Sequence, residues 1–254
     1  MTRSVVAGAL GLGAAAVVGA GYRAVFGSRS QAFGDFPYRA DTADKVVALT
    51  FDDGPNEPYT SYLLDILDSR AVPATFFQVG RCGERFPDAT RRVVQDGHVL
   101  ANHSLDHSLP SYLSDPSQQH QIDAAQAVLH DIAGVWPALY RPPWLCHRPA
   151  VLRTIATRRL QVVSGTFCHP LELLQPPARM LANGAARRTR PGSILIFHDG
   201  REARGGPRRE SVAAVGLVID RLRSQGYRFT TVDRLLSVAP YLDAESAAPI
   251  PGTA

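Results

Sequence analysis

Lysine is almost absent from this 254-residue chain, because only Lys45 is a lysine among the 27 lysines and arginines. Arginine therefore produces the net charge of +4, and the arginines are scattered without aromatic residues between them. A surface that binds nucleic acid needs clustered cations and aromatic side chains that stack on bases. We therefore expect no nucleic-acid partner.

Cysteine is also rare, with three residues at Cys82, Cys146 and Cys168. Three cysteines build neither a disulfide-rich scaffold nor a zinc site with four thiolate ligands. In an oxidising compartment we expect Cys146 and Cys168 to pair, because each lies a few residues beyond the end of an expected strand. Three reduced, buried cysteines are an equally good interpretation.

Charged residues are few, at 20% of the chain, whereas hydrophobic residues make up 45%. This composition can fill a real core and does not fit a disordered chain. The sequence contains no Gly-x-Ser-x-Gly nucleophile elbow and no phosphate-binding loop. It therefore predicts a globular domain that uses neither of these two chemistries.

Charge is missing altogether from residues 4–22, which follow Arg3 and precede Arg23. A basic start and an apolar stretch are typical of a secretory signal, which is the preferred interpretation of residues 1–34, and a retained membrane anchor also fits. A buried N-terminal helix fits less well because of the many glycines. We expect an extracytoplasmic protein, secreted or anchored at the cell surface, with no other membrane contact.

Apolar runs alternate with helical patterns through the rest of the chain. We expect residues 35–44 to form a connector, residues 45–238 one folded domain, and residues 239–254 a loose tail. The expected strands cover residues 46–51, 74–79, 98–101, 138–141, 160–164, 193–197 and 227–230. Continuous apolar strands that are each followed by a helix indicate parallel β/α units, in a barrel or a doubly wound sheet. Active sites in both folds gather at the carboxyl ends of the strands.

Polar residues follow four of these strands at that end. The residues are Asp52 and Asp53 after the first strand, His103 and His107 after the third, Arg141 at the end of the fourth, and His198 with Asp199 after the sixth. Chance placement of so many titratable groups at one edge is improbable. The sequence therefore predicts a single site on this face.

A metal site is expected among these residues. His103 and His107 have the i, i+4 spacing that binds one ion if their loop forms a helical turn. With Asp53 they form a set of two histidines and one carboxylate, which leaves coordination positions open for water and substrate. This set suits Zn²⁺, and Co²⁺ or another divalent ion also fits the ligand types.

The remaining residues suit acid–base chemistry. Asp52 is free to take a proton, and Arg141 is expected to hold it by a charge-assisted pair, although a purely structural salt bridge is an alternative. His198 suits a general acid that protonates a leaving amine, with a structural core histidine as its alternative. Five other histidines have no such setting and are interpreted as surface or structural residues: His98, His120, His130, His147 and His169.

Five motifs in order resemble those of the NodB-homology polysaccharide deacetylases. They are TFDDGP at 50–55, VPATFF at 72–77, NHSLDH at 102–107, RPPW at 141–144 and IFHD at 196–199. The resemblance covers about residues 45–236. It implies a distorted (β/α) barrel of about seven parallel strands in a single domain. It also implies metal-dependent removal of N- or O-acetyl groups from carbohydrate.

The resemblance also implies roles for individual residues. Asp52 resembles the catalytic base, Arg141 its partner and His198 the acid, while Asp53, His103 and His107 resemble the metal ligands. Trp144 stands where tyrosine is usual in the family and would offer its backbone N–H to the oxyanion. This role uses the main chain, so the change of side chain should be tolerated.

One family motif is missing. The family usually carries an Asp-Trp pair after the fifth strand, with the aspartate beside the acid histidine and the tryptophan lining the acetyl pocket. The sequence here reads SGTFCHP at 164–170. Phe167 is expected to line the pocket, and no residue obviously replaces the aspartate. Without a carboxylate partner, the pKa of His198 is expected to fall.

The sequence thus predicts a metal-dependent hydrolase that removes acetyl groups from an N-acetylated glycan such as peptidoglycan or a chitin-like oligomer. A catalytically silent glycan-binding protein on the same fold is the first alternative, which the missing Asp-Trp pair favours and an intact Asp52 and His198 oppose. An O-acetyl esterase and a small-amide hydrolase are further alternatives. We expect a monomer.

Overall fold

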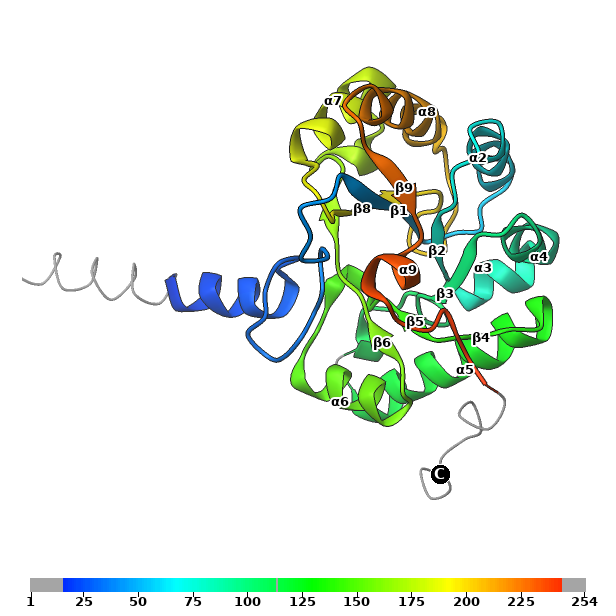
Figure 1. Ribbon diagram of the computed structural model, residues 1–254. Coiled ribbons are helices and arrows are strands. Elements are labelled where there is room, and N and C mark those ends of the chain that lie inside the picture. Colours follow the sequence, from blue (N-terminus) through cyan, green and yellow to red (C-terminus); the bar gives the residue numbers. More distant parts are fainter. Residues whose placement is uncertain (1–15, 113, 244–254) are drawn as a thin grey trace, which may run out of the picture.

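A curled sheet of eight parallel strands lies at the centre of the computed structural model, which describes residues 16–112 and 114–243 (Figure 1). The strands are β1 (Val46–Asp52), β2 (Thr75–Gln78), β3 (Val99–Asn102), β5 (Leu139–Tyr140), β6 (Gln161–Val162), β7 (Thr166–Phe167), β8 (Ile194–His198) and β9 (Arg228–Thr230). Their order is β6-β5-β3-β2-β1-β8-β7, and β9 pairs with the first half of β1. The expected parallel (β/α) barrel in a single domain is therefore confirmed, as a curled half-barrel. The two-residue strand β7 was not predicted.

Helices other than α9 cover the outside of this sheet (Figure 1). The helices are α2 (Tyr59–Asp68), α3 (Gly80–Arg85), α4 (Pro87–Gln95), α5 (Asp115–Ala133), α6 (Pro149–Thr157), α7 (Ala178–Arg188), α8 (Arg209–Ser224) and α9 (Val232–Leu236). Three short 3-10 turns are η1 (Pro110–Tyr112), η2 (Pro143–Leu145) and η3 (Glu172–Leu174). Helix α5 begins with Asp115 and Pro116 and ends before Gly134, whose φ of 72° lies in the left-handed region that glycine readily adopts.

Alternation along the strands decides which side chains reach the centre of the barrel. On β1, Leu49 and Phe51 belong to the core between the sheet and the outer helices, whereas Ala48 belongs to a separate cluster inside the barrel. Because neighbouring side chains leave a strand on opposite faces, Thr50 and Asp52 share the inward face with Ala48. The β1 strand therefore directs Asp52 into the mouth of the barrel.

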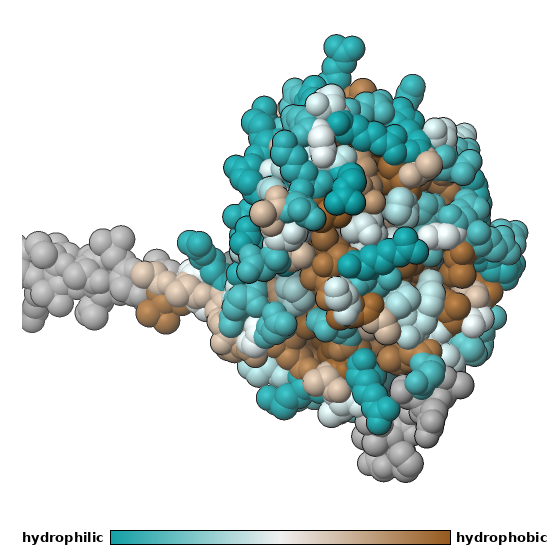
Figure 2. All heavy atoms as spheres, in the orientation of Figure 1, coloured by the Kyte–Doolittle hydropathy of each residue, from teal (hydrophilic) through white to brown (hydrophobic). Residues whose placement is uncertain are grey.

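The opposite end of the barrel is closed by α9. Val232 of α9 is fully buried against Ala48, Val99 and Ile194, which lie near the amino ends of their strands. In Figure 1, α9 lies across the centre of the strand ring. Figure 2 shows hydrophobic side chains near the centre of this face and hydrophilic ones over the outer helices. Access to the barrel is therefore left to the carboxyl ends of the strands.

Residues 36–40 pack against the sheet between the residues that follow β6 and those that precede β8. Phe36 is fully buried, the carbonyl of Pro37 accepts a hydrogen bond from the Ser164 N–H at 2.8 Å, and the Ala40 N–H donates to Gly192 at 2.8 Å. Residues 35–44 were expected to be a connector. Residues 36–40 are instead attached to the domain, with the side chain of Phe36 buried, whereas Asp41, Ala43 and Asp44 are exposed.

The segment before Phe36 is also attached to the domain. The carbonyl of Val25 accepts a hydrogen bond from the His147 N–H at 3.2 Å, and the hydroxyl of Ser164 donates to the Ser28 carbonyl at 2.5 Å. Residues 16–26 form a helix that projects from the body (Figure 1). The rest of the expected signal or anchor, residues 1–15, lies outside the described residues.

The structure differs from two expectations, the loose C-terminal tail and the Cys146–Cys168 disulfide. Strand β10 (Tyr241–Leu242) pairs antiparallel with β4 (Trp136–Pro137), so the tail is ordered at its start, and residues 244–254 lie outside the described part. All three cysteines are free and buried. The Cys146–Cys168 pairing is therefore wrong, and the alternative of three reduced cysteines holds.

No helix within residues 16–112 and 114–243 combines the length and the apolar character needed to cross a membrane.

Candidate active site

Asp52 and Arg141 meet inside the mouth of the barrel. Nη1 of Arg141 donates to Oδ1 of Asp52 at 2.6 Å, and the Arg141 side chain is fully buried. Arg141 follows the end of β5 and crosses the barrel to reach β1, so the expected pair forms between two strands that are not adjacent in the sheet. The roles of base and partner remain predictions.

Three further N–H groups of Arg141 also donate hydrogen bonds. Nη1 donates to the hydroxyl of Thr50 at 2.7 Å, Nε to the Val163 carbonyl at 3.2 Å, and Nη2 to the Ser164 carbonyl at 2.8 Å. The guanidinium lies 4.0 Å from the ring centroid of Phe77. A planar cation held by four hydrogen bonds has little freedom to move, so it fixes the Asp52 carboxylate in one position.

Asp53 turns toward the site through an unusual backbone conformation. Its φ of 73° lies in the left-handed region, which redirects the chain immediately after β1. The next residue must be glycine, since a Cβ on Gly54 would come within 2.2 Å of a carboxylate oxygen of Asp199. Oδ2 of Asp53 accepts a hydrogen bond from the Glu202 N–H at 2.9 Å, which leaves Oδ1 for other partners.

Both expected histidine ligands face Asp53. Nε2 of His103 lies 3.4 Å and Nε2 of His107 lies 3.3 Å from Oδ1 of Asp53. Nδ1 of His103 lies 2.6 Å from the carbonyl of Arg141 and donates to it in the tautomer that leaves Nε2 free. Burial tends to raise the pKa of Asp53, but its contacts with His103 and His107 outweigh this and hold that pKa well below its ordinary value.

The loop that carries these histidines is not helical. Ser104 and His107 have φ values of 74° and 55°, and the Ser104 N–H donates to Oδ1 of Asn102 at 2.8 Å. The helical turn that the i, i+4 spacing required was therefore a wrong expectation. The loop still brings both imidazole rings to Asp53. The left-handed backbone at Ser104 and His107 turns the chain so that both rings reach the same carboxylate.

Asp53, His103 and His107 fit a divalent metal ion. Their ligand atoms all lie within 4.8 Å of one another, and the three side chains are buried. Oδ1 of Asp53 is buried without a hydrogen-bond partner, which is costly unless a ligand satisfies it. Two imidazoles and one carboxylate are a donor set that zinc accepts, although it does not select zinc over other divalent ions.

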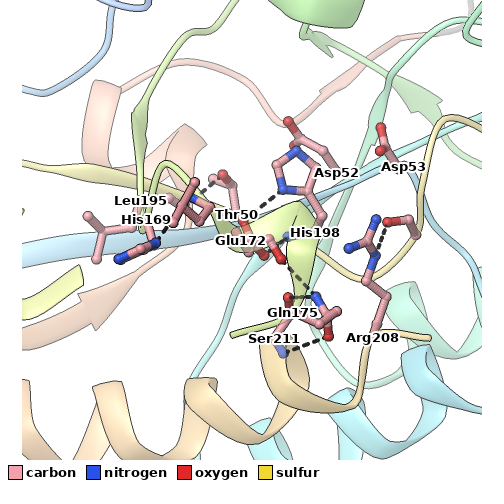
Figure 3. Close-up of polar contacts among 12 residues, drawn as sticks. Thr50, Asp52, Asp53, His169, Glu172, Gln175, Leu195, His198, Arg208 and Ser211 are labelled. Atoms are coloured by element: carbon pink, nitrogen blue, oxygen red, sulfur yellow. Dashed lines mark hydrogen bonds and ion pairs between the residues drawn. The ribbon is translucent and has the colours of Figure 1, made fainter. Parts of the chain in front are cut away.

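His198 has a carboxylate partner that the sequence did not predict. Nδ1 of His198 lies 2.9 Å from Oε2 of Glu172, and the backbone N–H of His198 donates to Oε1 of Glu172 at 2.9 Å. Figure 3 shows the imidazole between Glu172 and Asp52. The expectation that nothing replaces the missing aspartate was wrong, since Glu172 reaches the histidine from η3.

The pKa of His198 consequently moves in the opposite direction from the one expected. Burial tends to lower it, but the negative charge and the hydrogen bond of Glu172, with further contributions from Asp53 and Asp52, raise it to about 9. Burial also tends to raise the pKa of Glu172, and the contact with His198 lowers it overall. The only sequence signal for Glu172 is an acid within the apolar stretch Leu171–Leu174, which is weak evidence.

Asp199, beside His198, is buried next to Gly54. Its Oδ2 accepts a hydrogen bond from the Thr60 hydroxyl at 2.6 Å, and burial raises its pKa to about 7. The side chain of Asn56 donates to the Asp199 carbonyl at 3.0 Å. These contacts attach the loop after β8 to the loop after β1, so Asp199 supports the position of Asp53.

Trp144 and Phe167 line the pocket above these groups. The Trp144 ring packs edge-on against His107 with centroids 4.3 Å apart, and the Phe167 ring is parallel to His198 at 6.2 Å. His169, interpreted from the sequence as surface or structural, also lines this pocket. The lining consists of Asp52, Asp53, His103, His107, Pro142, Trp144, Leu145, Phe167, His169, Pro170, Glu172, Leu173, His198 and Glu202.

The fold and the site together define a hydrolase of the curled α/β barrel class, with a candidate divalent-metal centre, a carboxylate and an imidazole in one pocket. The sequence pattern of the polysaccharide deacetylases matches residues 39–163. A peptidoglycan-N-acetylglucosamine deacetylase of Bacillus cereus is 32% identical over 197 residues, which cover 76% of this chain and 89% of the relative. The chain belongs to the polysaccharide deacetylase family, as the motifs predicted.

Other relatives agree with this assignment. A chitooligosaccharide deacetylase of Azorhizobium caulinodans is 31% identical over 190 residues, with 71% of this chain and 90% of the relative covered. The crystal structure of the Bc1960 peptidoglycan N-acetylglucosamine deacetylase is similar with a TM-score of 0.73 and 27% identity, over 81% of this chain and 94% of that one. A pseudoenzyme from Bacillus anthracis shares the fold with a TM-score of 0.72 at 22% identity.

Proposed function

We propose that this chain is a metal-dependent deacetylase of N-acetylated glycan, with peptidoglycan or a chitin-like oligomer as substrate. The observation that carries the proposal is the convergence of three groups in one pocket. These groups are the Asp53, His103 and His107 cluster, the Asp52–Arg141 pair and the His198–Glu172 pair. The names of the relatives support a glycan substrate for this chain.

The metal would be held by Asp53, His103 and His107, with zinc as the first choice and cobalt as the second. A bound divalent ion supplies Lewis acidity, which polarises the acetyl carbonyl and makes a water molecule easier to deprotonate. The protein contributes the geometry of the ligand set through the hydrogen bonds that orient Asp53 and His103.

Asp52 takes the proton of the attacking water in this mechanism. Its Oδ1 is held by Arg141, so the carboxylate is fixed beside the metal ligands and offers Oδ2 to the water. His198 then gives a proton to the departing amine through Nε2, because Nδ1 is bound to Glu172. The backbone N–H of Trp144 stabilises the oxyanion, and Phe167 borders the acetyl group.

A catalytically silent glycan-binding protein is the second candidate. The fold similarity to a pseudoenzyme shows that this fold alone does not establish activity. Both pairs of acid–base groups argue against it, since a binding protein needs neither a held carboxylate nor a protonated imidazole. An O-acetyl esterase would use the same groups, and a small-amide hydrolase would need only part of the pocket.

The proposal is tested by acetate release from N-acetylglucosamine oligomers and from peptidoglycan with the purified full-length chain. We expect release by the native protein and a loss of about 10²- to 10⁴-fold in Asp52→Asn, which removes the general base. Asp220→Asn, at an exposed pair with Arg70, is the matched control and should keep full activity. Absence of acetate from every N-acetylated glycan and O-acetylated ester would favour the silent binder.

We also propose that the chain acts outside the cytoplasm as a monomer held by its N-terminal segment. Cleavage near residue 34 would remove the contacts of Val25 and Ser28 with the domain, which supports a retained anchor over a cleaved signal. Cell fractionation followed by the mass of the purified chain tests this. A secreted chain that begins near residue 35 would contradict it.

A further inference from the structure

Glu172 is a buried carboxylate whose two oxygens both contact one residue. Its exposed fraction is 2%, and its Oε1 and Oε2 bind the backbone N–H and Nδ1 of His198, each at 2.9 Å. A two-point contact fixes both the position of the histidine along β8 and the rotation of its ring. A single hydrogen bond would leave the ring free to turn.

This contact also selects which nitrogen of His198 faces the pocket. An ionised carboxylate only accepts hydrogen bonds, so Nδ1 carries a hydrogen and Nε2 is left as the nitrogen available to a substrate. The β1–β8 register places His198 directly opposite Asp52 (Figure 3). His198 side-chain exposure is 13%, so the ring reaches the pocket while its partner remains covered.

The turn that carries Glu172 is attached to helix α8. Nε2 of Gln175 donates to the Glu172 carbonyl at 3.0 Å and to the Ser211 hydroxyl at 2.7 Å, while its Oε1 accepts from the Glu210 N–H at 3.1 Å (Figure 3). Gln175 itself has a left-handed φ of 52°. One side chain thus joins η3 to the first turn of α8 and keeps Glu172 in place.

Other charged groups surround the pair without replacing it. Asp52 and Asp53 face His198 from the β1 side, and Cys168 and Arg208 are the further titratable or charged groups near Glu172. Arg208 is buried and donates to the Gly200 carbonyl rather than to Glu172. Glu172 therefore has His198 as its salt-bridge partner among the described residues.

We propose that Glu172 is the positioning residue of His198: it fixes the Nδ1–H tautomer, directs Nε2 into the pocket and stabilises the protonated ring until the leaving amine takes the proton. This inference rests on the proposed function for the identity of the leaving group. The arrangement of Glu172, His198 and Gln175 does not depend on that function.

The test compares Glu172→Gln with Glu172→Asp and with Glu84→Gln, a matched control at an exposed pair with Arg81. The pH dependence of kcat/KM for acetate release is measured for each variant. We expect the alkaline limb of Glu172→Gln to move down by about one pH unit or more, so that activity falls about twofold or more at pH 8, approaches a tenfold loss or more above pH 9, and changes little at pH 6. The alkaline limb of Glu172→Asp should lie close to that of the wild type, and the alkaline limb of Glu84→Gln should not move.

A second readout does not require activity. The imidazole of His198 is titrated by NMR in the wild type and in the variants, and its nitrogen shifts report the tautomer. We expect an Nδ1–H tautomer for neutral His198 in the wild type and a lower pKa in Glu172→Gln. If Glu172→Gln does not fold, the wild-type tautomer and Glu172→Asp still decide the question.

The outcomes separate the two proposals. A shifted His198 titration in a protein that releases no acetate would support the role of Glu172 and overturn the proposed deacetylase. Acetate release with the same pH profile and the same tautomer in wild type and Glu172→Gln would overturn the role of Glu172 and leave the deacetylase in place.

Discussion

Arg141 is the residue on which the geometry of the candidate base depends. It is fully buried and donates to Asp52, Thr50 and two backbone carbonyls. A buried carboxylate that loses its cation keeps the cost of burial without its compensation. The effect of removing Arg141 should therefore appear in stability as well as in activity.

We predict that Arg141→Met loses about 3–5 kcal/mol of unfolding free energy and most of its deacetylase activity. Chemical denaturation and acetate release measure the two effects. Arg70→Met, at an exposed pair with Asp220, is the control and should change stability by about 1 kcal/mol or less. An Arg141→Met variant with wild-type activity would show that the pair is only structural.

The side chains that the strand ends carry come together in the structure as the sequence predicted, whereas Glu172, which a turn carries, was missed. Asp52, Arg141 and His198 follow from the alternation of buried strands, which fixes the direction of each side chain. Glu172 lies in a short 3-10 turn whose path depends on Gln175 and α8. No local pattern encodes that long-range contact, so the pKa of His198 was expected to shift the wrong way.

At the scale of elements, the segment at residues 36–40 completes the barrel. The sheet ends at β6 and β7, and Phe36 packs with Tyr140 and Ile196 inside the curl. The positions of the main strands and helices along the chain were predictable because apolar runs and helical patterns specify them, whereas the order of the strands in the sheet was not predicted. The role of residues 36–40 was not predicted either, since a short polar segment with one phenylalanine looks like a connector.

We predict that Phe36→Ala destabilises the domain by about 3–5 kcal/mol, because it leaves a cavity at the junction of the sheet edges. Phe33 lies three residues earlier and is 39% exposed, so Phe33→Ala is the control, with an expected loss of about 1 kcal/mol or less. Thermal and denaturant unfolding measure both variants. Equal losses would mean that residues 36–40 do not complete the barrel.

At the scale of the whole molecule, the two ends of the barrel have different roles. Helix α9 closes the amino ends of the strands, and the loops at the carboxyl ends carry the pocket. The N-terminal segment attaches on the pocket side of the barrel, through the contact of Ser28 with Ser164, which lies between β6 and β7. If this segment is retained as an anchor, the pocket would be held near the membrane surface.

The proposed deacetylase depends on Asp53, His103 and His107 to hold the metal that the reaction needs. The direct measurement is acetate release by the chelator-treated full-length chain as zinc or cobalt is added back, with bound metal counted in parallel. His103→Ala removes one ligand, and His120→Ala, on an exposed position of α5, is its control. We predict that activity returns with about one metal ion per chain in the wild type and in His120→Ala, but not in His103→Ala. Full activity without metal, or metal binding that restores no release from any acetylated glycan, would contradict the account.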